Sequence, residues 1–194
     1  MSEVKCKYTT WINCILIQSA LGGFDKKKSP GPDELKPVVF GHLPQRYIEY
    51  LEYIYKSCIH LHYTPCLWKK TRVIFIPKPG KESYRKAKSF RPISLSNYLL
   101  KGLERLAAWK MDKALKEFPI HKKQHGFQKK KSTESALSNT VNYIESFVMK
   151  QQYALGIFLD ISSAFDSICP HHIRRSLLEH GGGEGYGRMV LRIS

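Results

Sequence analysis

One carboxylate at the end of an apolar run is the feature of this sequence best suited to chemistry. Residues 153–161 are almost continuously apolar and contain Asp160. Such a run predicts a buried central strand. A carboxylate at its end would lie at the edge of a sheet, where it can bind Mg²⁺, because hard divalent cations take oxygen ligands. The competing interpretation is that Asp160 only ends the strand in a turn, and Asp166 is better explained as a turn or helix-start residue.

Two cations lie within a predicted β-hairpin, one after its first strand and one in its second strand. Residues 72–76 form a β-branched run that stops at Pro77, and residues 90–95 form a second extended piece after a basic linker. Lys78 and Arg91 could both face a triphosphate, since arginine offers a fork for phosphate oxygens and lysine a mobile point charge. For either residue alone, a solvated charged loop remains the alternative.

A third candidate is a basic loop that contains one aromatic residue. Gln124, Gly126 and Phe127 precede three consecutive lysines that end at Lys131. An aromatic ring interleaved with basic side chains could grip a nucleic-acid backbone. We therefore consider Gln124, Gly126, Phe127 and Lys131 as candidate nucleic-acid contacts.

The elements that must position these residues are mixed α and β. Apolar spacing of three and four predicts helices over residues 44–62, 97–118 and 132–150, and Pro170 begins a shorter one that ends at the glycines 181–183. The side chains expected to face inward are Ile48, Leu51, Ile54, Tyr55, Cys58 and Ile59, then Leu99, Leu103, Leu106, Ala107, Ala114 and Leu115, then Ala136, Leu137, Val141, Ile144 and Phe147. Residues 1–25 form a lead-in without a clear pattern.

Composition points to a polyanionic partner. Lys and Arg number 32 against 16 Asp and Glu, which gives a formal charge of +16. Basic side chains that release counterions from phosphates supply most non-specific nucleic-acid affinity. The 5 cysteines are odd in number and irregular in spacing, which is typical of reduced intracellular thiols rather than a disulfide or zinc framework. No apolar run reaches the roughly 20 residues of a membrane span.

Five short motifs, taken in order, resemble reverse transcriptases of non-LTR retrotransposons, with jockey-like elements as the nearest group. They are residues 28–33, 75–81, 89–95, 124–133 and 158–166. The resemblance covers residues 26–180. It implies an α+β fold, namely the fingers and a partial palm of a right-hand polymerase, truncated, with residues 1–25 as the lead-in and 181–194 as a Gly-rich tail.

The resemblance also implies roles for individual residues. Asp160 would bind the two catalytic Mg²⁺ ions, with the Ile161 carbonyl helping to hold one of them. Lys78 and Arg91 would hold the triphosphate. Phe165 would act as the steric gate that favours deoxynucleotides, and Ser163 and Ala164 would line the nucleotide pocket through their backbone. The implied partners are an RNA template, a DNA primer and deoxynucleoside triphosphates, with no membrane. The implied location is intracellular and nuclear, and the sequence does not indicate an oligomeric state.

One departure from the family pattern limits the activity that the resemblance implies. The sequence contains no Asp-Asp pair, so it carries only one of the three metal carboxylates that the family uses. We therefore expect negligible polymerase activity from this chain alone. Two other functions remain open. One is a non-catalytic, basic nucleic-acid-binding remnant, and the other is an interaction module that docks on a polymerase and supplies no chemistry.

Overall fold

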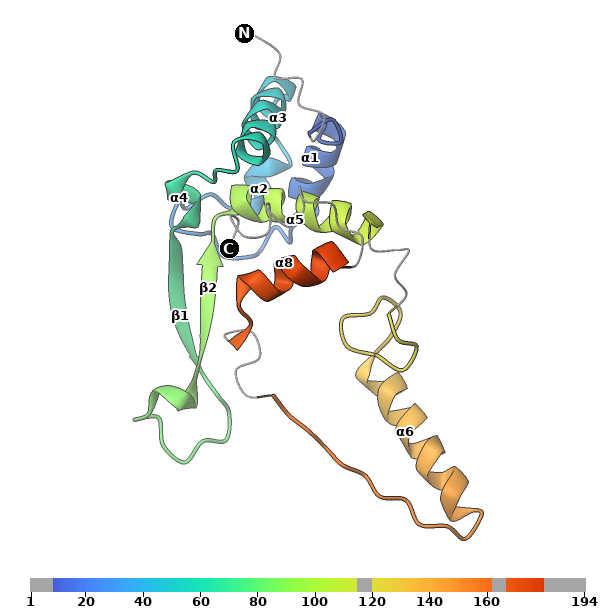
Figure 1. The fold of residues 1–194 in the computed structure, drawn as a ribbon. Coiled ribbons are helices and arrows are strands. Elements are labelled where there is room, and N and C mark those ends of the chain that lie inside the picture. Colours follow the sequence, from blue (N-terminus) through green and yellow to red (C-terminus); the bar gives the residue numbers. More distant parts are fainter. Residues whose placement is uncertain (1–8, 115–119, 162–166, 180–194) are drawn as a thin grey trace. The chain divides into compact units, whose positions relative to one another are not determined.

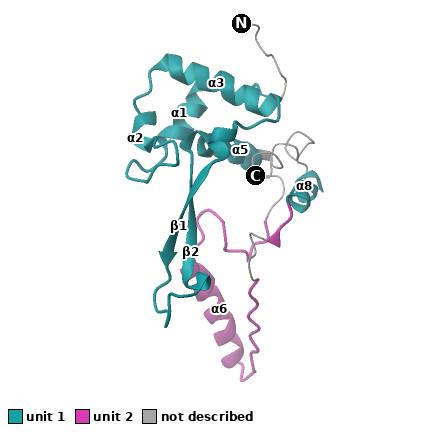
Figure 2. Cartoon of the chain, turned by 90° about the vertical axis from the view of Figure 1, so that its left-hand side faces the viewer, with its two compact units in different colours: residues 1–115, 170–194 teal, residues 116–169 magenta. Residues whose placement is uncertain are grey.

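The chain divides into two compact units. In the computed structural model, residues 9–114, 120–161 and 167–179 are described (Figure 1). The first unit comprises residues 1–115 and 170–194, and the second comprises residues 116–169 (Figure 2). The combination of helices with one small sheet agrees with the mixed α and β class expected from the sequence.

Helices build the core of the first unit. They are α1 (Cys14–Gly22), α2 (Pro37–Phe40), α3 (Gln45–His60), α4 (Cys66–Lys69) and α5 (Tyr98–Ala114). Their apolar side chains form one cluster. Its buried members are Ile12, Ile17, Ala20, Leu21, Phe40, Ile48, Leu51, Tyr55, Cys58, Ile59, Trp68, Tyr98, Leu100, Leu103, Leu106 and Ala107.

Helix α1 lies in the stretch that showed no clear pattern. Asn13 begins it, because its side chain accepts a hydrogen bond from the Leu16 N–H at 2.9 Å. Ile17, Ala20 and Leu21 are buried, yet Ile15 on the same helix is 73% exposed. Since apolar residues occur on more than one side of α1, it has no amphipathic stripe from which the sequence could predict it.

Helix α3 is the amphipathic helix that the spacing predicts. Five of its six expected core residues are buried, and the exception is Ile54, which is 37% exposed. Helix α5 also begins where expected, since the Asn97 side chain accepts a hydrogen bond from the Leu99 N–H at 2.8 Å. Of its predicted inward residues, Leu103, Leu106 and Ala107 are buried and Leu99 is partly buried. Leu115 and the side chain of Ala114 lie outside the described part of the chain.

Tyr55 joins α3 to α5. Its ring is fully buried and meets the Trp68 ring edge-on at 5.8 Å. Its hydroxyl donates to the Leu99 carbonyl at 2.7 Å, which satisfies the polar end of the side chain. Burial raises the pKa of Tyr55. The hydroxyl can approach this closely because α5 has a glycine there: a Cβ on Gly102 would lie 2.7 Å from it.

The predicted hairpin is confirmed. Strands β1 (Thr71–Pro77) and β2 (Phe90–Ser96) pair antiparallel, from Thr71 opposite Ser96 to Pro77 opposite Phe90. All seven residues of β1 are exposed, so the hairpin extends from the helices without a covering layer among the described residues (Figure 1). Its position therefore depends on the ends of its strands.

One such end is braced by the loop at residues 29–33. The Tyr98 hydroxyl, on the first residue of α5, donates to the Ser29 carbonyl at 3.1 Å. Gly31 is buried directly against the junction between β2 and α5, where a Cβ would lie 2.9 Å from the Ser96 carbonyl and the Asn97 nitrogen. The motif at residues 28–33 thus needs glycine for a close backbone approach.

In the second unit, α6 (Thr133–Val148) begins with a capping box formed by Ser132 and Ser135. The prediction that Leu137, Val141 and Ile144 face inward is wrong. Leu137 is 65% exposed and no residue of α6 is buried. Ala136 and Phe147 are partly buried. The spacing correctly identifies an apolar face, but none of its residues is buried.

The predicted buried strand at residues 153–161 is also wrong. The segment has no hydrogen-bonded partner in the two-stranded sheet, and Phe158 is 91% exposed. An apolar run forms a strand only where a neighbour is available to pair with it. The last predicted helix is confirmed as α8 (Pro170–Glu179). Among the described helices, none combines the length and apolarity that a membrane crossing requires.

We expect Gly31→Ala to lower the free energy of unfolding by about 1–3 kcal/mol, as overpacking does in other cores. The added Cβ would meet backbone atoms, which cannot rotate away as a side chain can. Urea unfolding followed by circular dichroism measures the change. Gly22→Ala is the control, since nothing lies within 4 Å of a Cβ there. If the two variants unfold at the same urea concentration, the brace contributes no stability.

Candidate functional site

The register of the hairpin puts Lys78 and Arg91 on one face. Arg91 of β2 lies opposite Ile76 of β1. The Lys78 N–H donates to the Ser89 carbonyl at 2.8 Å, so the pairing continues past the end of β1. Since cross-strand partners share a face and side chains alternate along a strand, Arg91 and Lys78 are diagonal neighbours. Diagonal neighbours have Cα atoms roughly 7–8 Å apart, which suits two cations binding one polyphosphate.

The tip of the hairpin, residues 78–90, is a folded lobe. The Tyr84 hydroxyl donates to the Lys78 carbonyl at 2.8 Å, and its ring meets Phe90 edge-on at 5.9 Å. The buried Ser89 hydroxyl donates to the Ser83 carbonyl at 2.6 Å. The Lys78 ammonium donates to the Lys88 carbonyl at 2.8 Å. These bonds, together with Gly80 at φ +72°, give the tip a defined shape.

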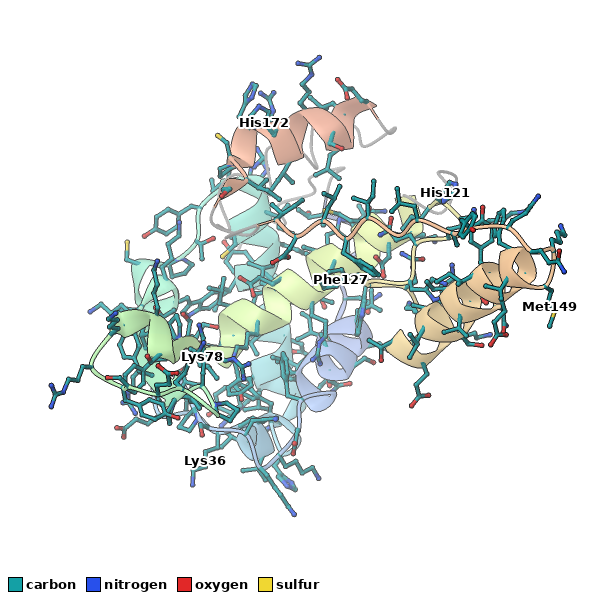
Figure 3. The ribbon with its side chains drawn as sticks, turned by 90° about the horizontal axis from the view of Figure 1, so that it is seen from below. Lys36, Lys78, His121, Phe127, Met149 and His172 are labelled. Carbon is teal, nitrogen blue, oxygen red and sulfur yellow. The ribbon has the colours of Figure 1, made fainter. Side chains whose placement is uncertain are left out.

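The tip is strongly basic. Four exposed cations, Lys81, Arg85, Lys86 and Lys88, follow Lys78 with Glu82 as the sole acidic residue among them. The half-buried Lys78 side chain is held at the base of this group by its bond to the Lys88 carbonyl (Figure 3). An anion that reaches Lys78 and Arg91 therefore approaches past further positive charge, which raises its local concentration.

A second basic element, the loop at residues 121–131, lies within the second unit. The Lys131 ammonium points back into this loop and donates to the carbonyls of Lys122 and Gln124, the latter at 2.8 Å. The Gln124 amide donates to the Gly126 carbonyl at 3.4 Å. Lys131 and Gln124 thus hold the loop together.

His125 attaches the same loop to the start of α6. Its Nδ1 is 2.9 Å from the Ser135 hydroxyl, and its Nε2 is 3.3 Å from the Asn139 amide nitrogen. The Ser135 hydroxyl already donates to the Ser132 carbonyl at 2.9 Å. With the hydroxyl hydrogen assigned to the Ser132 carbonyl, Ser135 accepts from His125; in this assignment Nδ1 carries the proton and Nε2 accepts from Asn139.

Phe127, labelled in Figure 3, is the one apolar residue of this loop. Its side chain is 95% exposed and its φ is +57°. A left-handed conformation costs a bulky residue roughly 1–2 kcal/mol. Phe127 lies between His125 and Lys131, whose side-chain bonds hold the loop on either side of it. Strain of this kind is common at binding loops.

The described residues do not assemble a metal site. Asp160 is exposed, and no group of three or more His, Cys, Asp or Glu side chains able to hold an ion occurs in the described part of the chain. Asp160 and the Ile161 carbonyl are oxygen donors of the kind that Mg²⁺ prefers, but two donors do not form a coordination shell. Three other predicted site residues, Ser163, Ala164 and Phe165, lie outside the described residues.

Several positioning residues could not be recognised from the sequence. Tyr84, Ser89 and Tyr98 bond to main-chain carbonyls that are 6 to 69 residues away along the chain. No periodicity or motif indicates such partners. Ser135 is the exception, because a serine three residues after Ser132 is a local sequence signal for a capping box. The capping box fixes where α6 begins after the loop.

Comparison with known proteins confirms the resemblance that the five motifs suggested. A family model described as reverse transcriptase (RNA-dependent DNA polymerase) matches residues 76–185, which is more than half of the chain. The chain is similar to the probable RNA-directed DNA polymerase from transposon BS of Drosophila melanogaster, with 33% identity over 155 residues. It is also similar to the RNA-directed DNA polymerase from mobile element jockey of the same organism, with 32% identity over 158 residues.

These two alignments each cover 78% of the chain but 17% of the relative. A third relative is the retrovirus-related Pol polyprotein from type-1 retrotransposable element R2 of Popillia japonica, with 28% identity over 180 residues. That alignment covers 90% of the chain and 23% of the relative. The chain thus spans a sixth to a quarter of the length of these curated relatives.

We expect Ser89→Ala to open the hairpin tip, because it removes the bond to the Ser83 carbonyl. Trypsin should then cut faster after Lys81, Arg85, Lys86 or Lys88, while the helices remain resistant. Mass spectrometry of timed digests identifies the cut sites. Ser94→Ala, at an exposed position of β2, is the matched control. Identical cutting rates in the two variants would show that the Ser89 bond does not hold the tip.

Proposed function

Because the chain belongs to the reverse transcriptase (RNA-dependent DNA polymerase) family, we propose that it is the nucleotide-binding part of an RNA-directed DNA polymerase of a non-LTR retrotransposon. In this proposal residues 26–180 correspond to the fingers and part of the palm. The RNA template, the DNA primer and the deoxynucleoside triphosphates are its partners. Action in the nucleus, where such elements integrate, is part of the same proposal.

The observation that carries the proposal is the common face of Lys78 and Arg91. Their register makes them diagonal neighbours on an exposed hairpin. The planar guanidinium of Arg91 can bind two phosphate oxygens at once. The ammonium of Lys78 can leave the Lys88 carbonyl and bind a third phosphate oxygen instead. A triphosphate bound there would be oriented by Arg91 and neutralised by both side chains.

The roles of the residues near the sugar and near the metal ions are proposed from the family resemblance. Reverse transcriptases use divalent metal ions, and Asp160 with the Ile161 carbonyl would contribute ligands to Mg²⁺. Ser163 and Ala164 would line the pocket, and Phe165 would exclude a 2′-hydroxyl. Since the described residues do not complete a metal site, we derive no catalytic step from them. The positive charge of the chain, +16, favours the nucleic-acid partners.

We expect Arg91→Ala and Lys78→Ala each to weaken deoxynucleoside triphosphate binding at least about tenfold, since a hydrogen bond to a charged group contributes about 1.5–3 kcal/mol. Fluorescence anisotropy of a base-labelled deoxynucleotide measures this. Arg72→Ala is the control, because it removes the same charge from the same face at a greater distance from the site. Arg72 is four residues before Ile76, the cross-strand partner of Arg91. Equal losses in all three variants would indicate a non-specific charge effect and contradict the site.

Primer extension on an RNA template with Mg²⁺ tests the polymerase itself. We expect negligible synthesis from the 194 residues alone, because they contain no Asp-Asp pair. Asp160→Ala is the comparison. Synthesis that depends on Asp160 would mean that other groups supply the remaining metal ligands. Salt-sensitive template binding, without nucleotide binding at Lys78 and Arg91, would favour the alternative of a non-catalytic nucleic-acid-binding remnant.

A further inference from the structure

Three hydrogen bonds hold Lys78 at the base of the hairpin tip. Its N–H donates to the Ser89 carbonyl at 2.8 Å, and its ammonium donates to the Lys88 carbonyl at 2.8 Å. Its own carbonyl accepts from the Tyr84 hydroxyl at 2.8 Å. Of these three partners, Tyr84 alone bonds through its side chain, so the residue type at position 84 decides whether the third bond exists.

The Tyr84 hydroxyl replaces a missing bond of the β-ladder. Lys78 continues the antiparallel pairing and lies opposite Ser89. Two residues paired in this way normally exchange both of their N–H···O bonds. Here the Ser89 N–H donates instead to the Lys86 carbonyl at 2.9 Å, within the short helical turn Ala87–Ser89. The Lys78 carbonyl thus loses its ladder donor, and the tyrosine hydroxyl takes the place of that donor.

Tyr84 is itself held against β2. Its ring meets the ring of Phe90 edge-on at 5.9 Å, and Phe90 is the residue before Arg91. The residue before Tyr84 is also anchored, since its carbonyl accepts from the Ser89 hydroxyl at 2.6 Å. The Tyr84 side chain is 45% exposed, so it contributes little to a buried core. Its contacts connect the neighbour of Arg91 with the main chain of Lys78.

The spacing of two cations decides which anions they bind together. Arg91 is fixed within β2, whereas Lys78 lies beyond the end of β1 and depends on the tip for its position. A phosphate chain that contacts one cation is presented to the second at a high effective concentration, provided that the spacing matches. A single phosphate group that contacts one cation gains nothing from the spacing.

We propose that Tyr84 is a positioning residue for the phosphate chain of the nucleotide. Its hydroxyl holds Lys78 at the distance from Arg91 that a triphosphate spans, and the hairpin therefore favours triphosphates over monophosphates. The bond is made to the main chain of Lys78, so it persists when the ammonium leaves the Lys88 carbonyl for a phosphate oxygen. This inference rests on the proposed function and deepens it by assigning phosphate-number selectivity to a residue that does not touch the nucleotide.

The test measures phosphate selectivity in Tyr84→Phe, which keeps the ring beside Phe90 and removes only the hydroxyl. Unlabelled deoxynucleoside triphosphate and monophosphate compete with a base-labelled deoxynucleoside triphosphate in fluorescence anisotropy. We expect Tyr84→Phe to weaken triphosphate binding about three- to tenfold, the range for one neutral hydrogen bond, and to leave monophosphate binding unchanged. Tyr50→Phe, which removes a hydroxyl from an exposed tyrosine of α3, is the matched control and should change neither affinity.

Double variants identify the cation through which Tyr84 acts. Adding Tyr84→Phe to Lys78→Ala should cause no further loss of triphosphate affinity, because the side chain that the hydroxyl positions is absent. Adding Tyr84→Phe to Arg91→Ala should still weaken binding, since Lys78 remains. A general loosening of the tip predicts a different result, namely a further loss on both backgrounds. Circular dichroism of each variant verifies folding.

The inference fails on any of three results. They are unchanged triphosphate affinity in Tyr84→Phe, equal losses for monophosphate and triphosphate, and a further loss when Tyr84→Phe is added to Lys78→Ala. Each of these leaves the proposed function intact if Lys78→Ala and Arg91→Ala still weaken binding. If neither of those two variants weakens nucleotide binding, the proposed function is contradicted and the inference with it.

Discussion

The close approach of α5 to α3 is the constraint on which the first unit depends. Tyr55 is among the largest fully buried side chains, and its hydroxyl would be costly to bury without a partner. The Leu99 carbonyl, in the first turn of α5, accepts from it. Gly102 leaves space for the tyrosine and for Leu21 of α1 at the same point. One residue without a side chain therefore allows three helices to meet.

The position of one end of the hairpin follows from this helix packing. Helix α5 begins where β2 ends, so a fixed α5 also fixes one end of the hairpin. Tyr98 and Gly31 add a brace at the same junction, and Phe24 meets the Tyr98 ring edge-on at 5.0 Å. Burial raises the pKa of Tyr98 and lowers the pKa of Lys101, which lies over the Tyr98 ring. The exposed basic tip is thus carried by a tightly packed base, a common division between scaffold and binding loop.

The described residues of the second unit show what local interactions achieve without a buried core. Its loop and the start of α6 are ordered by side-chain bonds to nearby groups, chiefly those of Lys131, His125 and Ser132. Most of the apolar residues that follow are exposed, and none is buried. Local hydrogen bonds can therefore define the shape of a binding loop, but burial of an apolar face requires a second layer, which the described residues do not supply.

The sequence by itself determined the features that depend on near neighbours. Helices α3, α5, α6 and α8 and the hairpin follow from periodicity, capping residues or turn residues, which are local. The family motifs are likewise short runs of neighbouring residues, recognised by their resemblance to a known family. Tertiary structure decided the rest. It buried Ile17, Ala20 and Leu21 of α1 and left α6 and residues 153–161 exposed. It also turned Lys131 inward while Phe127 faces solvent. These outcomes depend on whether a distant segment is present to pack or to accept a hydrogen bond, and no pattern within the segment itself contains that information.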